Sequence, residues 1–369
     1  MGRTGGGRRS PLAVAVANAV VLAAGLLLFL FGAATLFLPV GTAGEALRPA
    51  DAPPNLAATG LYSDLASRTI DPRNFPFSPQ YPLWSDGATK HRWIHLPEGT
   101  AIDASDPDVW VFPAGTKVWK EFSFHGRPVE TRLIEALDNG EWRFAAYAWN
   151  ADGSDALLAP VRGLRDVVEI RPGIRHNIPG VLDCRVCHEG NQVEILGFSA
   201  LQLSPDRDPN APNAETLTPN MVDLATLIRQ GLLRSYPPDW SKQPPRIDAK
   251  SPTARAALGY LHANCGNCHN PANPLAKLGL ILRHSVAPGA AGEPALATTL
   301  NQTGEFTIPG ATRDESFRLR SGDPAHSAIL VRVESRNPLR QMPPLGTKIA
   351  DASAVDLVRR WILEDRIRE

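Results

Sequence analysis

The sequence predicts a multidomain α+β protein: an N-terminal transmembrane helix, an antiparallel β-rich domain, and then a mainly α-helical region. Three observations lead to this prediction: a long uncharged N-terminal segment, a series of aromatic and β-branched segments, and helical spacing of apolar residues toward the C-terminus. Acidic and basic residues balance at 38 each, which indicates neither a nucleic-acid partner nor a polyanionic substrate. The expected domains are residues 1–44, 45–170, 171–250 and 251–369.

The N-terminal segment has the properties of a membrane anchor or an export signal. Three arginines precede residues 10–44, which contain no charged residue. About 20 apolar residues cross a bilayer, and the basic end stays in the cytoplasm. A cleaved signal usually has an apolar core of about 7–15 residues, so we favour an uncleaved inner-membrane anchor. Small residues at 41–43 leave cleavage open. In both cases residues 45–369 are expected in the periplasm, either tethered or soluble.

Strand-like segments follow at residues 91–96, 108–124, 127–137 and 140–150. They are rich in aromatic and β-branched residues with partial alternation, and Asp138-Asn139-Gly140 predicts a hairpin turn. Six of the eight tryptophans fall between residues 84 and 149, where we expect a sandwich or barrel whose core they fill; a ligand-binding face is the alternative. The histidines of this region lack tight ligand spacing, so they predict no metal site; they are His91, His95 and His125.

All four cysteines belong to two copies of one short motif. The copies are Cys184-Arg-Val-Cys187-His188 and Cys265-Gly-Asn-Cys268-His269. A disulfide within a pair would close only a tiny loop, and a thioredoxin-like site needs a βαβ setting that both copies lack. A shared zinc site would leave both histidines without a role. Covalent attachment of c-type haem uses every residue, because two thiols tether the porphyrin and the histidine ligates iron. The motifs therefore predict two haems.

The segment after residue 250 predicts two helices that flank a methionine. Residues 252–269 form one expected helix, in which Gly259 would allow a close crossing with a second helix that begins near residue 351. Met342 lies between them, before two prolines that fix its backbone. It is the expected sixth iron ligand of the second haem. Core packing of Met342 is the alternative, with His284 and His326 as other ligand candidates.

This C-terminal segment resembles a class I cytochrome c domain over about residues 251–366. The resemblance depends on the second motif, on Met342-Pro-Pro and on the closing helix with Trp361. It implies a cytochrome c-like haem region with His/Met iron suited to one-electron transfer. In addition, YPLWSDGATKHRWIHLPEGT is similar to a segment of a family of bacterial dihaem c-type cytochromes, and that resemblance extends over about residues 60–369. It implies no particular substrate.

The sixth ligand of the first haem is less defined. No amphipathic helix leads into Cys184, because Pro172, Pro179 and Gly180 interrupt the preceding segment. Met221 is the favoured ligand opposite His188. The alternatives are His176, His262 approaching from the second domain, or a vacant position.

The predicted function is one-electron transfer by a membrane-anchored periplasmic dihaem cytochrome. Its expected partners are a donor dehydrogenase or quinol-oxidising protein and an acceptor cytochrome or oxidase; no nucleic acid is expected. Whether the protein is also an enzyme stays open, and no catalytic residue is assigned. The alternatives are a dihaem peroxidase, whose first haem would open to peroxide, and a haem-bearing docking or ligand-binding subunit of a dehydrogenase complex.

Overall fold

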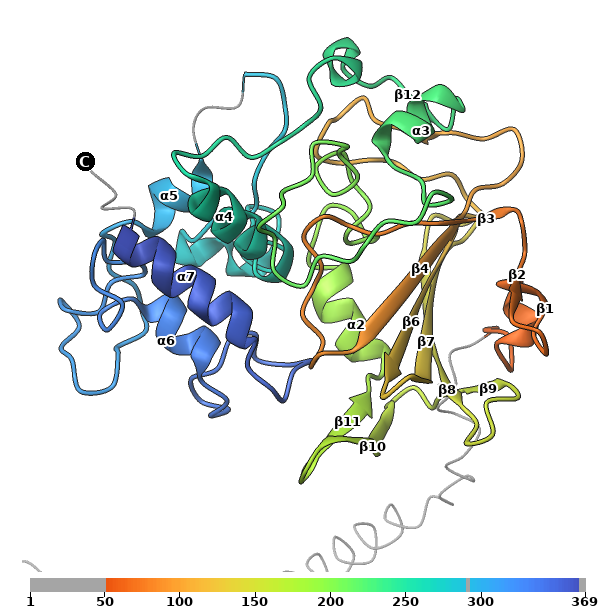
Figure 1. The fold of residues 1–369 in the computed structure, drawn as a ribbon, viewed down its shortest axis with the longest axis horizontal. Helices are drawn as coiled ribbons and strands as arrows, with labels where there is room; N and C mark the ends of the chain where they lie inside the picture. The colour runs from red at the N-terminus through yellow and green to blue at the C-terminus, as the bar shows by residue number, and fades with distance from the viewer. Residues whose placement is uncertain (1–50, 290–292, 365–369) are drawn as a thin grey trace, which may run out of the picture. The chain divides into compact units, whose positions relative to one another are not determined.

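A six-stranded antiparallel sheet is the main feature of the computed structural model, which describes residues 51–289 and 293–364 (Figure 1). These residues belong to one compact unit. The strand order is β3-β4-β6-β7-β8-β9, so all but the first and last strands have a neighbour on each side. The bounds are β3 Asn74–Pro76, β4 Thr89–His95, β6 Lys117–Phe124, β7 Arg127–Ala136, β8 Trp142–Trp149 and β9 Ala156–Leu158.

Two tight turns set the register of the central strands. His125 and Gly126 join β6 to β7 with φ angles of 51° and 75°, a conformation that glycine adopts without steric cost. The turn at Asp138-Asn139-Gly140 joins β7 to β8, and Gly140 has a φ of 81°. The hairpin that the sequence predicts at this position is confirmed.

The two faces of the sheet bury different cores. One face carries Trp119 and Leu133, which pack against residues near the start of the described chain such as Leu56. The other face carries Ile94 and Val118, which pack with Phe198 and other residues that follow the first cysteine motif. Side chains alternate between the two faces along each strand, so each face presents apolar residues that pack against a separate core.

Short elements complete the β-rich part of the unit. The 3₁₀ helix η1 (Ala57–Thr59) precedes the pair β1 (Tyr62–Asp64) and β2 (Thr69–Ile70), β10 (Leu164–Arg171) pairs with β11 (Ile174–Ile178), and β5 (Ile102–Asp103) runs parallel to β12 (Leu233–Arg234). Two short helices lie on either side of β12 in the chain, α3 (Leu224–Arg229) and the 3₁₀ helix η2 (Pro238–Ser241).

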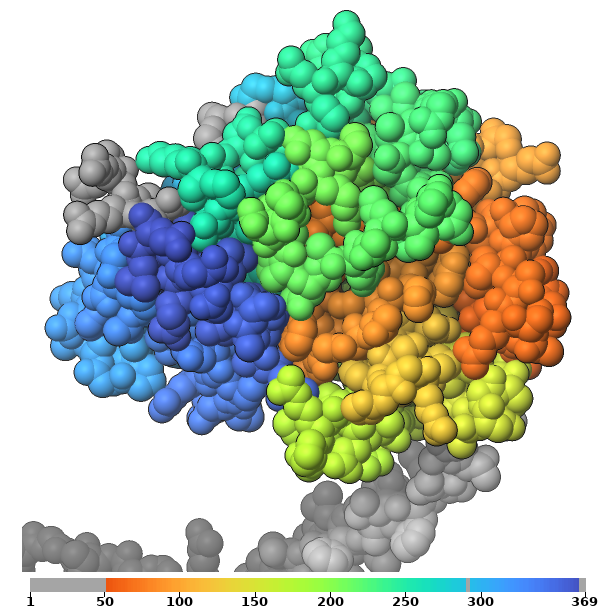
Figure 2. Space-filling view, in the orientation of Figure 1, coloured from red at the N-terminus to blue at the C-terminus, as the bar shows by residue number. Residues whose placement is uncertain are grey.

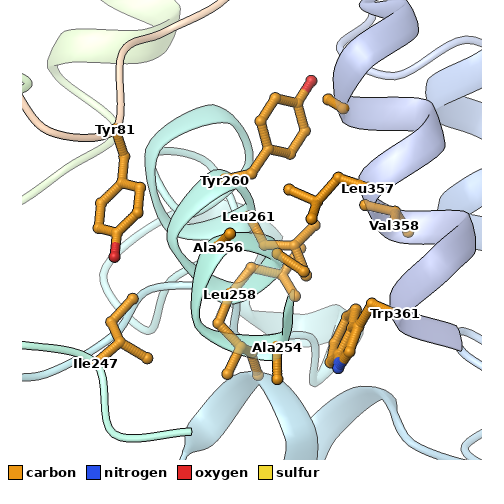
Figure 3. Packing of buried hydrophobic residues seen from close by; sticks show 14 of the residues in the cluster. Tyr81, Ile247, Ala254, Ala256, Leu258, Tyr260, Leu261, Leu357, Val358 and Trp361 are labelled. Carbon is orange, nitrogen blue, oxygen red and sulfur yellow. The ribbon is translucent and has the colours of Figure 1, made fainter. Parts of the chain in front are cut away.

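Helices α4 (Pro252–Asn264) and α7 (Ala352–Glu364) pack against each other through a shared apolar core (Figure 3). Leu258 and Leu261 of α4 belong to the same buried cluster as Trp361 of α7. Gly259 does not serve this crossing as expected. A Cβ atom built on it would lie 2.1 Å from Cε1 of Tyr81, so the glycine admits the tyrosine ring on another side of α4.

The prediction of a mainly α-helical, cytochrome c-like region after residue 250 is wrong. Besides α4 and α7, this region contains only the 3₁₀ helix η3 (Pro274–Leu278) and the short helices α5 (Pro294–Thr299) and α6 (Ala328–Glu334) within the described residues. Both η3 and α5 begin at a proline, because proline is favoured in a first helical turn and excluded from a helix interior. Residues 300–327 form isolated bridges and turns. The described chain is β-rich with six α-helices.

The predicted transmembrane helix also needs correction. Across residues 51–289 and 293–364, every helix is too short or too polar to cross a membrane. The segment on which that prediction was based, residues 10–44, lies outside the described residues.

Candidate functional site

The first cysteine motif forms helix α2 (Val181–His188), which contacts strand β8 of the sheet. Gly180 precedes the helix in an extended conformation, and its N–H donates to Oδ2 of Asp183 at 2.9 Å. A Cβ atom on Gly180 would lie 2.5 Å from the carbonyl oxygen of Val161, so only glycine lets the chain enter α2 at this point. The glycine at the N-terminus of α2 explains how the chain can begin a helix directly after the strands β10 and β11.

The second motif forms the turn that ends helix α4. The backbone N–H groups of Cys265 and His269 donate to the carbonyl oxygens of Leu261 and Cys265, both at 2.9 Å. A Cβ atom on Gly266 would lie 2.6 Å from the carbonyl oxygen of His262, so this turn is compact. The buried face of α4 thus anchors the second motif to the protein core.

The two motifs lie directly beside each other. Nδ2 of Asn273 donates to the carbonyl oxygen of Gly190 at 2.8 Å, which joins the chain just after each motif. The Cys187 and Cys268 thiols are close enough to interact, and this interaction raises the pKa of Cys187 and lowers the pKa of Cys268. All four cysteines are free thiols in this structure. Two segments about 80 positions apart in sequence therefore form one site.

A cavity opens beside the first motif. Its empty space, including the part open to solvent, is about 1310 Å³. His188 and His262 both line this cavity, so it is bordered by the first motif and by the last turn of α4. Apolar side chains such as Trp110 and Phe198 form part of its wall. In the space-filling view, the chain that follows α2 (green) surrounds a hollow in which earlier residues (orange) are visible (Figure 2).

Three cationic side chains form a row along the cavity wall. The sheet register places Arg92 opposite Lys120 and Lys120 opposite Arg132 on neighbouring strands. Like charges placed opposite each other destabilise a sheet unless other charges compensate them. Glu215 lies 2.6 Å from Arg92, and Glu130 lies 2.5 Å from Arg132. Among the described residues, no carboxylate pairs with Lys120.

Burial and the neighbouring cations hold the pKa of Lys120 well below its usual range. One guanidinium nitrogen of Arg92, Nη2, is buried without a hydrogen-bond partner in the described chain. The row, defined by Arg92, Lys120 and Arg132, is therefore suited to a ligand that brings carboxylates into the cavity. Sequence reasoning missed it, although an apolar residue on the same face of the sheet lies two positions from each member of the row: Ile94, Val118 and Ile134.

The two motif histidines have different surroundings. Nδ1 of His188 lies 2.5 Å from the carbonyl oxygen of Glu194, so this nitrogen carries the proton and donates. Its Nε2 atom then has a free lone pair, and burial lowers the pKa of the ring to about 4. Nδ1 of His269 is buried without a partner among the described residues, and burial lowers the pKa of this ring as well. Both rings are neutral at physiological pH, which is the form that ligates a metal.

The predicted sixth ligands lie in several places. Met221 and Met342 are both partly buried, and neither is among the residues that line the cavity of His188. The Met342 N–H donates to the carbonyl oxygen of Arg332 at 2.9 Å. The charge of Arg332 also acts on His269, where it contributes after burial to a lowered pKa. Met342 and His269 therefore share a neighbour.

The histidines proposed as alternatives have partners of their own. Nε2 of His176 lies 3.0 Å from Oε1 of Glu130, and the ring is buried outside the cavity. His326 pairs with Asp323 at 2.7 Å in a partly buried turn. His284 lines the cavity but bonds through Nδ1 to Glu293 at 2.5 Å. Of these alternatives, only His262 and His284 reach the cavity of the first motif.

A metal-binding cluster made by protein side chains alone is not present in residues 51–289 and 293–364. No three histidine, cysteine, aspartate or glutamate side chains there converge closely enough to hold a metal ion. The prediction of a metal-binding cluster is therefore wrong for these residues: His188 and His269 belong to no such group.

Comparison of the chain with protein-family models, curated proteins and solved structures found no match. The resemblance to dihaem cytochromes therefore stays a prediction from the motifs, and the site must be interpreted from its own geometry.

Proposed function

We propose that this chain is a c-type cytochrome that holds two haems and transfers single electrons between redox partners. The observation that supports it best is the juxtaposition of the two Cys-x-x-Cys-His motifs, whose following segments are joined by the hydrogen bond from Asn273 to Gly190. Two haems tethered at these positions would lie close together. A short separation favours passage of an electron from one to the other within the chain.

The residues present fit such a group. A c-type haem needs two thiols, a neutral histidine and an apolar cavity with partners for its carboxylates. Cys184 and Cys187 provide the thiols of the first site, and His188 offers Nε2 because its Nδ1 is held by the carbonyl of Glu194. The porphyrin itself provides four iron ligands, so each haem requires only one or two from the protein rather than a cluster of three.

Each part of the chain would have a defined role. When bound, each haem supplies the one-electron couple of its iron. His188 and His269 would hold the iron from one side, and the cationic row would neutralise carboxylates of the first haem. Because covalent attachment takes place outside the bacterial cytoplasm, the proposal includes a periplasmic location. Its partners would be a donor dehydrogenase or quinol-oxidising protein and an acceptor cytochrome or oxidase.

The test is the intact mass of the protein made in a host that matures c-type cytochromes. We expect two haems on the wild-type chain and one on each of two matched variants, Cys184→Ala/Cys187→Ala and Cys265→Ala/Cys268→Ala. Stepwise reductive titration should then show two one-electron waves in the wild-type protein and one in each variant. A bare polypeptide mass, or zinc in place of haem, would refute the proposal.

A further inference from the structure

His262 is held in one orientation by the backbone next to it. The N–H group of His284 lies 3.0 Å from Nδ1 of His262. A backbone N–H only donates, so Nδ1 must provide a lone pair, and in the neutral ring the proton then resides on Nε2. Turning the ring over would place carbon against this N–H and leave a buried donor unpaired, at a cost in stability.

The segment that supplies this N–H is fixed from both sides. Nη2 of Arg283 donates to the carbonyl oxygen of Asp108 at 2.6 Å, and the Val286 N–H donates to Oδ1 of Asp108 at 2.8 Å. The His284 ring is in turn bonded to Glu293. Residues 283–286 therefore form a rigid support for His262.

The two histidines that share the cavity have opposite tautomers. His188 donates through Nδ1 and keeps its Nε2 lone pair, whereas His262 accepts through Nδ1 and carries its proton on Nε2. Iron binds a nitrogen lone pair, so His188 is ready to ligate and His262 is not. No described residue accepts a hydrogen bond from Nε2 of His262. Burial, followed by the charge of Arg283, lowers the pKa of His262 to about 3, so it stays neutral.

Cationic side chains outnumber carboxylates along the cavity around His262, because four cations among the described residues line it together with one carboxylate, that of Asp108. Arg283 lines it, and the hydrogen bonds of its guanidinium go to the side-chain oxygen of Asn191 and to a backbone carbonyl, both neutral acceptors. Arg92 and Lys120 line the same space. A small anion with an acceptor atom would gain from these charges as well as from an N–H donor.

We propose that His262 is a hydrogen-bond donor to a small inorganic anion that binds at the first haem opposite His188, and is not itself an iron ligand. This inference rests on the proposed function, because it places the first haem in the cavity. If the inference is correct, the first haem has an open coordination position, and the residues around that position favour anionic ligands. Azide is a suitable probe of this class.

The test uses the protein with both haems attached, and its first measurement is the spin state of the oxidised iron. We expect one high-spin and one low-spin haem in the wild-type protein, and the same pattern in His262→Ala. Azide should convert the high-spin signal, and His262→Ala should weaken azide binding by about tenfold through loss of one charge-assisted hydrogen bond. His262→Gln keeps a side-chain N–H donor and should recover part of that affinity. His326→Ala, outside the cavity, should bind azide as the wild type does.

Other outcomes would overturn the inference. A fully low-spin wild type in which His262→Ala creates a high-spin haem would make His262 the sixth ligand. A first haem that stays low-spin in both proteins would assign that position to another residue. Unchanged azide affinity in His262→Ala would remove the proposed hydrogen bond. A protein mass without haem would instead refute the proposed function, so the two failures are distinguishable.

Discussion

The two cysteine motifs have the same pattern but different surroundings. The first lies on α2, whose side chains Leu182 and Val186 are 70% and 51% exposed, and its histidine faces a cavity. The second ends α4, most of which is buried, and His269 is only 8% exposed. Nδ1 of His188 has a carbonyl partner, whereas Nδ1 of His269 has none among the described residues.

Under the proposed function, this difference means that the motif would determine where a haem is attached, while the surrounding fold would determine what each iron can do. A hydrogen bond from Nδ1 to a carbonyl orients a ligating histidine and increases its basicity. The first site has this bond together with open space and positive charge. The second has a rigid apolar support and a nearby methionine segment. We therefore expect one site that admits exogenous ligands and one that is specialised for electron transfer.

The largest expected difference between the sites concerns the thioether of Met342. In Met342→Ala, the haem at His269 should lose its methionine ligand, and its reduction potential should fall by a fraction of the ~0.8 V range that axial ligands span. Redox titration and the sulfur-to-iron absorption band measure this. The matched control is Met221→Ala, which should leave both potentials and the band unchanged. Loss of the band in Met221→Ala alone would reverse the assignment.

A second difference concerns the cores behind the two sites. Trp361 is 1% exposed between α7 and α4, so Trp361→Ala should lower the free energy of unfolding by about 3–5 kcal/mol. Urea unfolding measures it, and Leu339→Ala, at 89% exposure, is the control.

Phe198→Ala should lower the free energy of unfolding by a similar amount because Phe198 is fully buried. Only Phe198 lines the cavity, so only its removal should also alter azide binding.

If Trp361→Ala costs less than about 1 kcal/mol, the packing of α4 on α7 does not support the second motif. If Trp361→Ala changes azide binding as much as Phe198→Ala does, the two sites are not separate in the way that their cores indicate.

Local patterns in the sequence are sufficient for some of these features. Asp138-Asn139-Gly140 predicts its hairpin because the turn depends on adjacent residues, and apolar spacing predicts α4 and α7 for the same reason. The motifs also identify every cysteine and histidine assigned to haem attachment. The long Pro- and Gly-containing segments between α4 and α7 are the reason that this region is not mainly helical.

Other features depend on contacts between distant residues, which no local pattern contains. The cationic row exists only because the register brings three strands together, and a shift of one residue would place Lys120 on the opposite face. The tautomer of His262 depends on a backbone N–H 22 positions away. Gly259 indicated a close approach, but its partner is Tyr81 rather than α7. Tertiary geometry therefore determines the differences between two sites that look alike in sequence.

The smallest expected effect is a pH dependence confined to the first site. Burial, followed by the charge of Arg92, lowers the pKa of Lys90 to about 8, and burial, followed by the charge of Arg92, holds the pKa of Lys120 well below its normal value of 10.5. Between the lowered pKa and 10.5, the unfolded chain binds more protons than the folded chain does. The free energy of unfolding should therefore rise with pH in this window, by at most about 1.4 kcal/mol per pH unit for each lysine.

Lys120→Met should raise stability at neutral pH and reduce this slope, whereas Lys277→Met, at an exposed position, should leave the slope unchanged. Carboxylates of a haem in the cavity would stabilise the charged form of Lys120, which lines it, so the slope should be steeper in Cys184→Ala/Cys187→Ala than in the protein with both haems. Cys265→Ala/Cys268→Ala should not steepen it, because Lys120 lines the cavity of the first motif. Equal slopes in the two double variants would mean that the cationic row does not distinguish the first site from the second.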